Sequence, residues 1–364
     1  KETFEKWTRR AAVLDGDVLL TREAPIGEVG YVQGTETIFL GQRIMQYRAN
    51  PEVLHSRFLL YTFLSPKLRQ QFGAHEGSGS VVSHIRVGDC FKFQIPLPDL
   101  DEQRAVAHIL GTLDDKIELN RRMNETLEAI ARAIFKSWFV DFDPVRAKAS
   151  GEPPESICRR LRLTPDLLAL FPDRLVDSEL GEIPEGWEQK RVDDLMELAY
   201  GKALKASDRV NGPVPVYGSG GITGYHSEHL VDGPGIIVGR KGTVGSLYWE
   251  DRSFFPIDTV FYVVPKVQLT YCYYLLQTLG LDRMNTDAAV PGLNRSNVYR
   301  LPVAWSPIEL RQAFDRVAKP LRDRMFTNKQ ESQTLENIRD TLLPKLLSGE
   351  LRVPVVDILA EATA

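Results

Sequence analysis

The chain has 364 residues, of which 43% are hydrophobic and 26% are charged. This length leaves room for roughly two or three domains, and the near-average composition excludes both a disordered chain and a fibrous repeat. The formal net charge of -4 at pH 7 shows no overall basic excess, so any surface that binds nucleic acid has to be a local one.

The cysteines and the apolar runs indicate the compartment. Cys90, Cys158 and Cys272 are odd in number and far apart, which excludes a disulfide framework or a four-thiolate zinc site and indicates a reducing environment. No apolar run approaches the roughly 20 residues of a membrane helix, and the start lacks the apolar segment of a signal peptide. We therefore expect a cytoplasmic protein without a membrane partner. Because the first methionine is Met45, we also expect that Lys1 is not a native start.

The first predicted part, residues 1–99, is an α+β domain. Short β-rich runs at residues 16–20 and 38–47 alternate with glycine and proline, and residues 57–64 have the pattern of a short buried helix. A long helix is predicted next, at residues 100–142. Roughly 40 residues at about 1.5 Å each make it about 60 Å long, which exceeds an ordinary globular helix.

The long helix carries a coiled-coil pattern. Its apolar residues recur in threes and fours from Val106 to Trp138, which predicts a seam for a second helix. Asn120 falls inside this seam, where a polar residue costs stability but can fix the register. A second long helix is predicted at residues 307–348, with Asn328 in the place of Asn120. The alternative is that both asparagines merely lie near fraying parts of the helices.

Residues 143–183, between the first long helix and the second domain, are rich in proline and charge. This composition predicts a linker with one short helix at residues 165–171. Residues 184–306 form the second predicted α+β domain, and residues 349–364 form a C-terminal tail. The expected elements of the second domain are β-rich runs at residues 235–239 and 258–264 and a short buried helix at residues 270–279.

The two domains with their helices read as copies of one unit. The stretch from Leu20 aligns with the stretch from Val238 at an offset of 218 residues, and the long helices align at an offset of 208. The first copy has no counterpart of residues 187–217, so its domain is expected to be incomplete at its beginning. A register held over this length predicts two domains of the same fold. The matched pairs include Arg22 with Arg240, Gly27 with Gly245, and Asn120 with Asn328.

Motifs for catalysis by the chain itself are weak. No GxxxxGK[ST] loop, no GxGxxG and no HExxH motif occurs. Asp173, Glu188 and Lys190 could be read as a Mg²⁺-dependent nuclease set, in which two carboxylates hold the metal and the lysine stabilises the attacking water. Such residues also recur by chance, and Asp173 lies in the proline-rich linker. A stand-alone Mg²⁺-dependent restriction endonuclease therefore stays open as the alternative function.

Glycine-rich loops with basic and hydroxyl side chains are the better candidates for a binding site. Glycine lets a backbone approach a partner, arginine can read a guanine edge, and lysine can neutralise a phosphate. The two glycine-rich loops are residues 217–226 and residues 238–245. Either loop alone could be a solvated turn, but the presence of equivalent basic loops at Arg22 and Arg240 favours DNA binding. Tyr217 and Tyr225 are expected to offer aromatic faces. The candidate DNA-binding residues are Arg22, His84 and Arg86 in the first copy and Tyr217, Ser219, Tyr225, Arg240, Lys241, Asn294, Arg295 and Asn297 in the second.

Four stretches resemble the DNA-specificity subunit of type I restriction-modification systems. Residues 95–148 resemble its central helix and the exit from that helix, and residues 170–187 resemble the entry to its second target-recognition domain. YGSGGITGY (residues 217–225) and GRKGTVG (residues 239–245) resemble core loops of that domain. Residues 337–353 resemble its distal helix end, so the likeness spans nearly the whole chain.

The resemblance implies two target-recognition domains, the first one incomplete, separated by two long antiparallel coiled-coil helices that act as a ruler on a split double-stranded DNA site. It implies a non-catalytic chain that binds no cofactor or metal and recruits two methyltransferase and two restriction (motor-nuclease) subunits. These partners would use S-adenosylmethionine, ATP and Mg²⁺. The missing beginning is expected to impair the reading of the first half-site. A purely structural coiled-coil protein, the third possibility, would leave the repeated basic loops unexplained.

Overall fold

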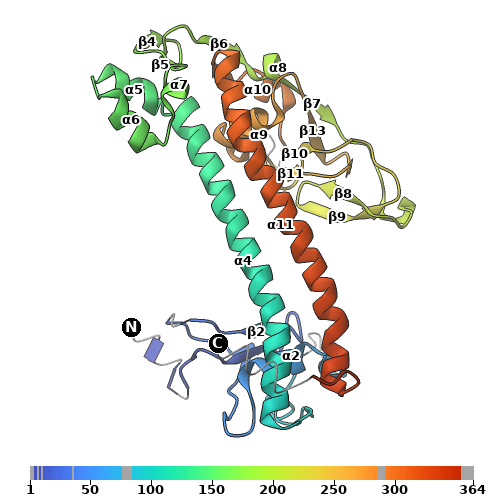
Figure 1. The fold of residues 1–364 in the computed structure, drawn as a ribbon. Helices are drawn as coiled ribbons and strands as arrows, with labels where there is room; N and C mark the ends of the chain where they lie inside the picture. Colours follow the sequence, from blue (N-terminus) through green and yellow to red (C-terminus); the bar gives the residue numbers. More distant parts are fainter. Residues whose placement is uncertain are drawn as a thin grey trace. The chain divides into compact units, whose positions relative to one another are not determined.

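The computed structural model has two compact units, each of which combines helices with small sheets (Figure 1). One unit comprises Lys1–Arg122 and Asn328–Ala364, and the other comprises Met123–Thr327. The predicted α+β class is confirmed. Within the described part of the chain, no helix is long and apolar enough to pass through a lipid bilayer. The structure describes residues 4–5, 8–9, 11–34, 37–75, 84–284 and 292–353.

The first unit is built on an antiparallel sheet with the strand order β2-β1-β3. Val18 and Leu20 both face its buried side because alternate strand residues point the same way. They share a hydrophobic cluster with Phe63 and Phe72 from two short helices. The elements are β1 (Val18–Thr21), β2 (Val29–Tyr31), β3 (Ile44–Tyr47), α2 (Ser56–Leu64) and α3 (Pro66–Gly73).

The second unit contains a four-stranded antiparallel sheet, β11-β10-β13-β7, and a three-stranded sheet, β12-β8-β9. Every residue of β10 is buried, which explains its continuous apolar sequence GIIVG. The strands of these sheets are β7 (Met196–Tyr200), β8 (Val214–Gly218), β9 (Gly221–His226), β10 (Gly235–Gly239), β11 (Leu247–Glu250), β12 (Phe255–Pro256) and β13 (Val260–Pro265).

Shorter elements complete the second unit. The helix α9 corresponds to α2 of the first repeat and is buried from Thr270 to Leu276. A two-stranded pair, β14-β6, brings the start and the end of the second domain together. These elements are β6 (Glu188–Arg191), α8 (Val192–Leu195), η1 (Ala206–Asp208), α9 (Leu269–Thr278), η2 (Leu281–Arg283), α10 (Arg295–Tyr299) and β14 (Pro302–Trp305).

The predicted pair of long helices is confirmed. These are α4 (Leu100–Phe139) and α11 (Ile308–Ser348), of 40 and 41 residues. In the first unit Leu110 shares a hydrophobic cluster with Leu343, and in the second unit the rings of Phe135 and Phe314 lie 5.3 Å apart. Positions further along α4 meet positions earlier in α11, so the two helices run antiparallel within each unit.

The segment predicted to be a linker with one short helix is more ordered than that. Each of its three helices has a proline in the first turn, where the missing N–H is no loss and the ring favours a helical φ. Val145, Ile157 and Phe171 are buried in the same cluster as Trp187. Such short helices bury too few residues to produce a long periodic pattern. The elements are α5 (Asp143–Ala149), α6 (Pro154–Leu161), α7 (Pro165–Leu168), β4 (Leu175–Ser178) and β5 (Gly181–Pro184).

Candidate nucleic-acid interface

Arg22 and Arg240 have the same backbone setting in the two repeats. Arg22 directly follows β1, and Arg240 directly follows β10. Each amide donates to the residue just before the neighbouring strand, and each carbonyl accepts from a distant segment. The bonds are Arg22 N to Arg43 O (2.8 Å) and Ile85 N to Arg22 O (2.8 Å), matched by Arg240 N to Thr259 O (2.9 Å) and Leu293 N to Arg240 O (2.8 Å). The repeat inferred from the sequence therefore extends to individual hydrogen bonds.

A glycine closes each of these loops. Gly27 and Gly245 have φ angles of 85° and 71°, in the left-handed region that favours glycine. The amide of Gly27 donates to Thr21 O at 3.0 Å, and the amide of Gly245 donates to Gly239 O at 2.8 Å. The same tight turn therefore sets the position of the arginine in both repeats.

Arg240 belongs to an aromatic cluster that the sequence did not reveal. Its guanidinium carbon lies 4.9 Å from the ring centre of Tyr200, and the guanidinium carbon of Arg295 lies 4.8 Å from the same centre. A cation over an aromatic ring is attracted by the ring quadrupole. Tyr200, which is 48% exposed, therefore holds together two arginines that are distant in sequence. Its sole signal in the sequence is its place at the end of a β-rich run, before Gly201.

Backbone carbonyls orient the same two guanidinium groups. Arg240 Nη1 donates to Asp258 O at 3.0 Å, and Arg295 Nη1 donates to Leu198 O at 3.3 Å. Each guanidinium has further N–H donors in a fixed plane, and such donors suit a base edge or a phosphate. Two of the predicted residues, Arg240 and Arg295, thus form one oriented cationic group.

The turn between β8 and β9 contacts the Arg240 loop. The Ser246 hydroxyl donates to Ser219 O at 2.6 Å, and the Tyr248 hydroxyl donates to the same oxygen at 3.2 Å. Lys241, next to Arg240, is exposed. The structure thus places the predicted Ser219, Arg240 and Lys241 on two loops that contact each other. Tyr225 is 51% exposed on β9, as an aromatic face requires.

Tyr217 does not present the aromatic face that the sequence predicted. It is 6% exposed and packs in a cluster with Ile237 and Phe254. Its hydroxyl donates to Glu250 Oε2 at 2.8 Å. Burial raises the pKa of the Tyr217 hydroxyl, and the nearby carboxylate of Glu250 raises it further. The surrounding glycines suggested exposure, but Tyr217 is a core residue of the three-stranded sheet β12-β8-β9.

Asn294 and Asn297 lie at the start of α10. The Asn294 side chain accepts from the Ser296 amide at 2.8 Å and so caps the helix. This cap fixes the first turn, which carries Arg295. Asn297 is half-buried within that helix. Asn294 therefore has a structural role in positioning Arg295, in addition to any contact with a ligand.

In the first unit, the Arg22 side chain is held against its own loop. Its Nε donates to Ile85 O at 2.9 Å, and its Nη1 donates to Gln42 O at 2.8 Å. His84 is half-buried, whereas Arg86 is exposed. Arg86 is thus the most accessible of the three predicted residues here. The residue after each matched arginine also forms an isolated β-bridge, Glu23 with His84 in the first repeat and Lys241 with Gly292 in the second. The two loops are therefore equivalent in this contact as well.

The three residues of the alternative nuclease set are engaged in two separate ion pairs. Asp173 pairs with Lys148 at 3.0 Å, and Glu188 pairs with Lys190 at 3.0 Å. Among the residues that the structure describes, no group of three or more His, Cys, Asp or Glu side chains could hold a metal ion. The geometry does not favour a nuclease centre.

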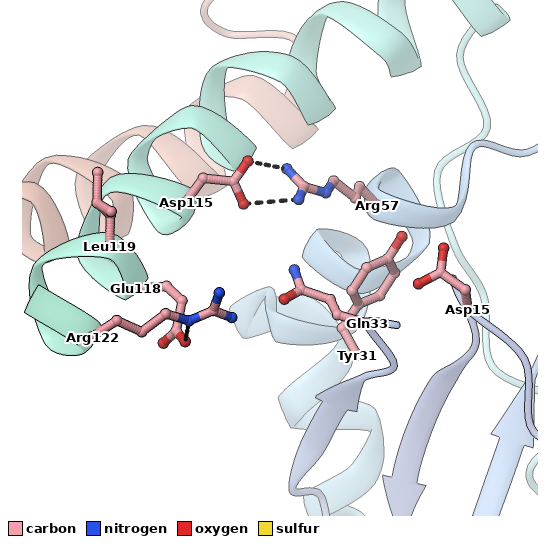
Figure 2. A pocket seen from close by; sticks show the side chains of 8 residues that line it. All are labelled: Asp15, Tyr31, Gln33, Arg57, Asp115, Glu118, Leu119 and Arg122. Carbon is pink, nitrogen blue, oxygen red and sulfur yellow. Dashed lines mark hydrogen bonds and ion pairs between the residues drawn. The ribbon is translucent and has the colours of Figure 1, made fainter. Parts of the chain in front are cut away.

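A polar pocket of about 570 Å³ lies beside α4 in the first unit (Figure 2). Arg57 reaches across to Asp115 with two hydrogen bonds of 2.8 Å each. On the next turn, hydrogen bonds from Arg121 and Arg122 lower the pKa of Glu118 to about 2. The pocket's cations are thus paired with carboxylates of α4, so it joins the first domain to the helix and is not a candidate DNA site.

The two predicted register residues meet in the first unit. Asn120 and Asn328 are fully buried, and Asn120 Nδ2 donates to Asn328 O at 3.5 Å. The same group donates to Glu331 Oε2 at 2.9 Å and lies 3.4 Å from Ser332 Oγ. Neither asparagine lies near a helix end, so the alternative of fraying does not apply.

Comparison with known proteins identifies the family. The family model for the type I restriction modification DNA specificity domain matches residues 8–129 and again residues 184–303. The HindI specificity subunit, a type I restriction enzyme component of Haemophilus influenzae, is 26% identical over 94% of this chain and 88% of its own length. The MjaIX specificity subunit of Methanocaldococcus jannaschii is 27% identical over 93% of this chain and 78% of its own length.

A solved structure shows the same fold. The S subunit of a type I restriction-modification system from M. genitalium has a TM-score of 0.54 and 20% identity, covering 92% of this chain and 83% of that one. The two matches to the family model fall within the two repeats found in the sequence, one in each. The chain therefore belongs to the type I restriction modification DNA specificity family, as a specificity subunit with two copies of the domain.

Proposed function

We propose that the chain reads a bipartite double-stranded DNA site with its two repeats. The observation that supports this most strongly is the equivalence of the loops at Arg22 and Arg240, which share their hydrogen bonds and their closing glycine turn. Two structurally equivalent loops with different side chains suit the reading of two different half-sites. The candidate contact residues are those in and around these loops.

The chemistry of the second repeat supports contacts in a DNA groove. Arg240 and Arg295 are oriented by carbonyls and by Tyr200, which reduces the entropy lost when they bind. Lys241 next to them would neutralise a phosphate. The exposed Tyr225 and the half-buried Ser219 and Asn297 would add stacking or hydrogen bonds. In the first repeat Arg86, His84 and Arg22 would have the equivalent roles.

The long helices would set the separation of the half-sites. At about 1.5 Å per residue, a helix of the length of α4 extends about 60 Å, compatible with half-sites about one DNA turn apart when the domains lean inward. We infer that the chain itself binds no cofactor. It would recruit two methyltransferase subunits, which use S-adenosylmethionine, and two restriction subunits, which use ATP and Mg²⁺, in the cytoplasm.

Co-expression with a methyltransferase subunit from the same system, in a host without adenine methylation, tests this function. Modified adenines are then mapped across the host genome. A split motif with a constant spacer is the expected result. Methylation at a single contiguous motif, or none from an assembled complex, would contradict the two-repeat reading. Mg²⁺-dependent cleavage by the purified chain alone would instead favour the nuclease set Asp173, Glu188 and Lys190.

A further inference from the structure

We propose that two ion pairs between α4 and α11 make this helix pairing selective, so that each repeat pairs with the other repeat and not with a second copy of itself. Both carboxylates of these pairs belong to α4, and both arginines belong to α11. The acidic side of α4, in the first repeat, therefore fits the basic side of α11, in the second repeat. The inference concerns assembly and does not depend on the DNA contacts proposed above.

The first ion pair lies in the first unit. Asp114 of α4 accepts from Arg339 Nη1 of α11 at 2.8 Å. Tyr61 of α2 donates its hydroxyl hydrogen to the other oxygen of Asp114, also at 2.8 Å. The two charged side chains are 27% and 30% exposed, so water screens this pair only in part. One recognition domain and two helices thus meet at a single carboxylate.

The second ion pair lies in the second unit. Arg322 of α11 donates to Glu128 Oε2 of α4 at 2.8 Å, and the Arg322 side chain is 7% exposed. Tyr274 of α9 donates to the same oxygen at 3.2 Å. The Arg322 guanidinium also lies over the rings of Trp249 and Tyr273, at 4.5 Å and 5.0 Å. The second pair again joins a recognition domain to both helices.

The internal repeat makes the two arrangements equivalent, with the charges exchanged. Asp114 and Arg322 occupy the same position of their respective helices, at the offset of 208 residues. Tyr61 and Tyr274 occupy the same position of α2 and α9, and each donates to the carboxylate of its pair. The position that is acidic on α4 is therefore basic on α11.

The apolar seam cannot by itself select the pairing of α4 with α11, called the mixed pairing below, over the pairing of two like helices. Leu113 corresponds to Leu321, and the buried Asn120 corresponds to Asn328. Two α4 helices would bring together nearly the same apolar surface as α4 with α11. In coiled coils of this kind, charges beside the seam choose the partner and its orientation.

Pairing of like helices would place like charges together. Arg339 corresponds to Ala131 of α4, one helical turn from Glu128, so two α4 helices would bring Asp114 near Glu128 at two symmetric places. Two α11 helices would likewise bring Arg322 near Arg339 twice. Because Arg322 is buried, neither water nor salt would screen that contact well. The mixed pairing satisfies all four charges.

A third ion pair between the helices has the opposite polarity. Lys116 of α4 lies 3.3 Å from Glu331 of α11, and these side chains are more exposed, at 36% and 42%. Water weakens exposed pairs, so this one has less influence on partner choice. It provides a matched control, since the same exchange of charges there has the opposite predicted effect on selectivity.

Exchanging the first pair tests the proposal in the full chain. The double variant Asp114→Arg with Arg339→Asp keeps an ion pair within the chain. It also gives each helix one acid and one arginine, so that like helices become complementary. We expect a several-fold rise in the fraction of differently tagged chains that co-purify after co-expression, with a matching dimer peak in size-exclusion chromatography with light scattering. Any domain-swapped pairs of α4 with α11 should form to the same extent in the parent and in the exchanged variant, because both keep the ion pair, so the rise measures pairing of like helices.

The control is Lys116→Glu with Glu331→Lys, which makes α4 more acidic and α11 more basic. It should leave co-purification at or below the parent level. The neutral double variant Asp114→Asn with Arg339→Gln covers the case in which the exchanged pair does not fold, and it should raise co-purification by a smaller amount. Co-purification that stays at the parent level in a folded exchanged or neutral variant, or that rises equally in the control, would overturn the proposal.

Discussion

Asn120 donates a hydrogen bond from Nδ2 to the backbone carbonyl of Asn328 at 3.5 Å, and the two asparagines are the same position of the two repeats. Among the described residues, the Oδ1 atom of Asn120 is buried without a hydrogen-bond partner. An unsatisfied buried oxygen costs free energy, so this contact is retained at a loss of stability. A polar residue at such a place is a known means of fixing the register of a coiled coil.

Replacing both asparagines by leucine should therefore not lower the stability. We expect the free energy of unfolding of Asn120→Leu with Asn328→Leu to stay within about 1 kcal/mol of the parent value or to exceed it. The register should become less well defined, because an apolar seam tolerates shifts. Denaturant unfolding measures the first effect. A spread of spacer lengths among the methylated sites of the co-expressed complex measures the second. A large loss of stability with an unchanged spacer would show that the pair serves packing alone.

Substitutions at Tyr200 test whether its ring positions the two arginines. Tyr200→Ala removes the ring over which Arg240 and Arg295 lie, and we expect DNA binding to weaken by about 1 kcal/mol for each lost cation–π contact. Tyr200→Phe keeps the ring and should bind nearly as well as the parent chain. The measurement is the affinity of the assembled complex for its methylation site at fixed salt. Equal affinity of the alanine variant and the parent would exclude a positioning role.

The two closing glycines provide a paired test of the loops. Gly27→Ala places a side chain at a positive φ, which costs about 1 to 2 kcal/mol, but the new Cβ meets Phe72 at an ordinary 3.5 Å. Gly245→Ala has the same φ cost, and its Cβ would lie 2.4 Å from backbone atoms of Leu281 and Asp282. We therefore expect the loss of thermal stability to be clearly larger for Gly245→Ala. Equal losses in the two variants would contradict this account of the second loop.

Long-range periodicity explains which features the sequence could predict. An apolar seam that repeats over many turns predicts the helices α4 and α11, and a register that holds across the repeat matches Arg22 to Arg240. Tyr200 was missed because its role depends on two arginines that only the folded sheet brings to it. Tyr217 was misjudged because neighbouring glycines describe the backbone and not the burial of the side chain between them.

The charge exchange between Asp114 and Arg322 shows a further limit. Each residue looks like ordinary helix surface in the sequence, and only the contacts with Arg339 and Glu128 show its place beside the seam. The helices α5 and α6 of the linker at residues 143–183 escape sequence-based prediction for a related reason. The linker's three helices bury only one to three residues each, too few for a periodic signal. Tertiary contacts, and not local propensity, determine these features.

Asp17 predicts that the first unit is sensitive to acid. It is fully buried, and it accepts hydrogen bonds from the Leu14 amide (2.7 Å), from Gln46 Nε2 (2.6 Å) and from Arg48 Nε (2.8 Å). Burial alone would raise the pKa of Asp17, but the hydrogen bonds from Arg48, Leu14 and Gln46 together lower it below its usual value. The equivalent position in the second repeat is Gly235, so this feature belongs to the first unit alone.

A carboxyl group whose pKa is lower in the folded state stabilises the fold at every pH above its usual pKa of about 3.9. That stabilisation is lost as the pH falls through the lower folded-state value, because the folded protein must then take up the proton. Asp17→Asn should cost about 1 to 2 kcal/mol at neutral pH, since Asn cannot pair with Arg48 in the same way. Thermal unfolding of the variant and the parent should converge as the pH falls below the usual carboxyl pKa of about 3.9 and through the lower folded-state value. As a control, Asp101→Asn alters an exposed ion pair and should change little at either pH. A difference that persists in acid would show that Asp17 acts through its shape and hydrogen bonds, and not through its charge.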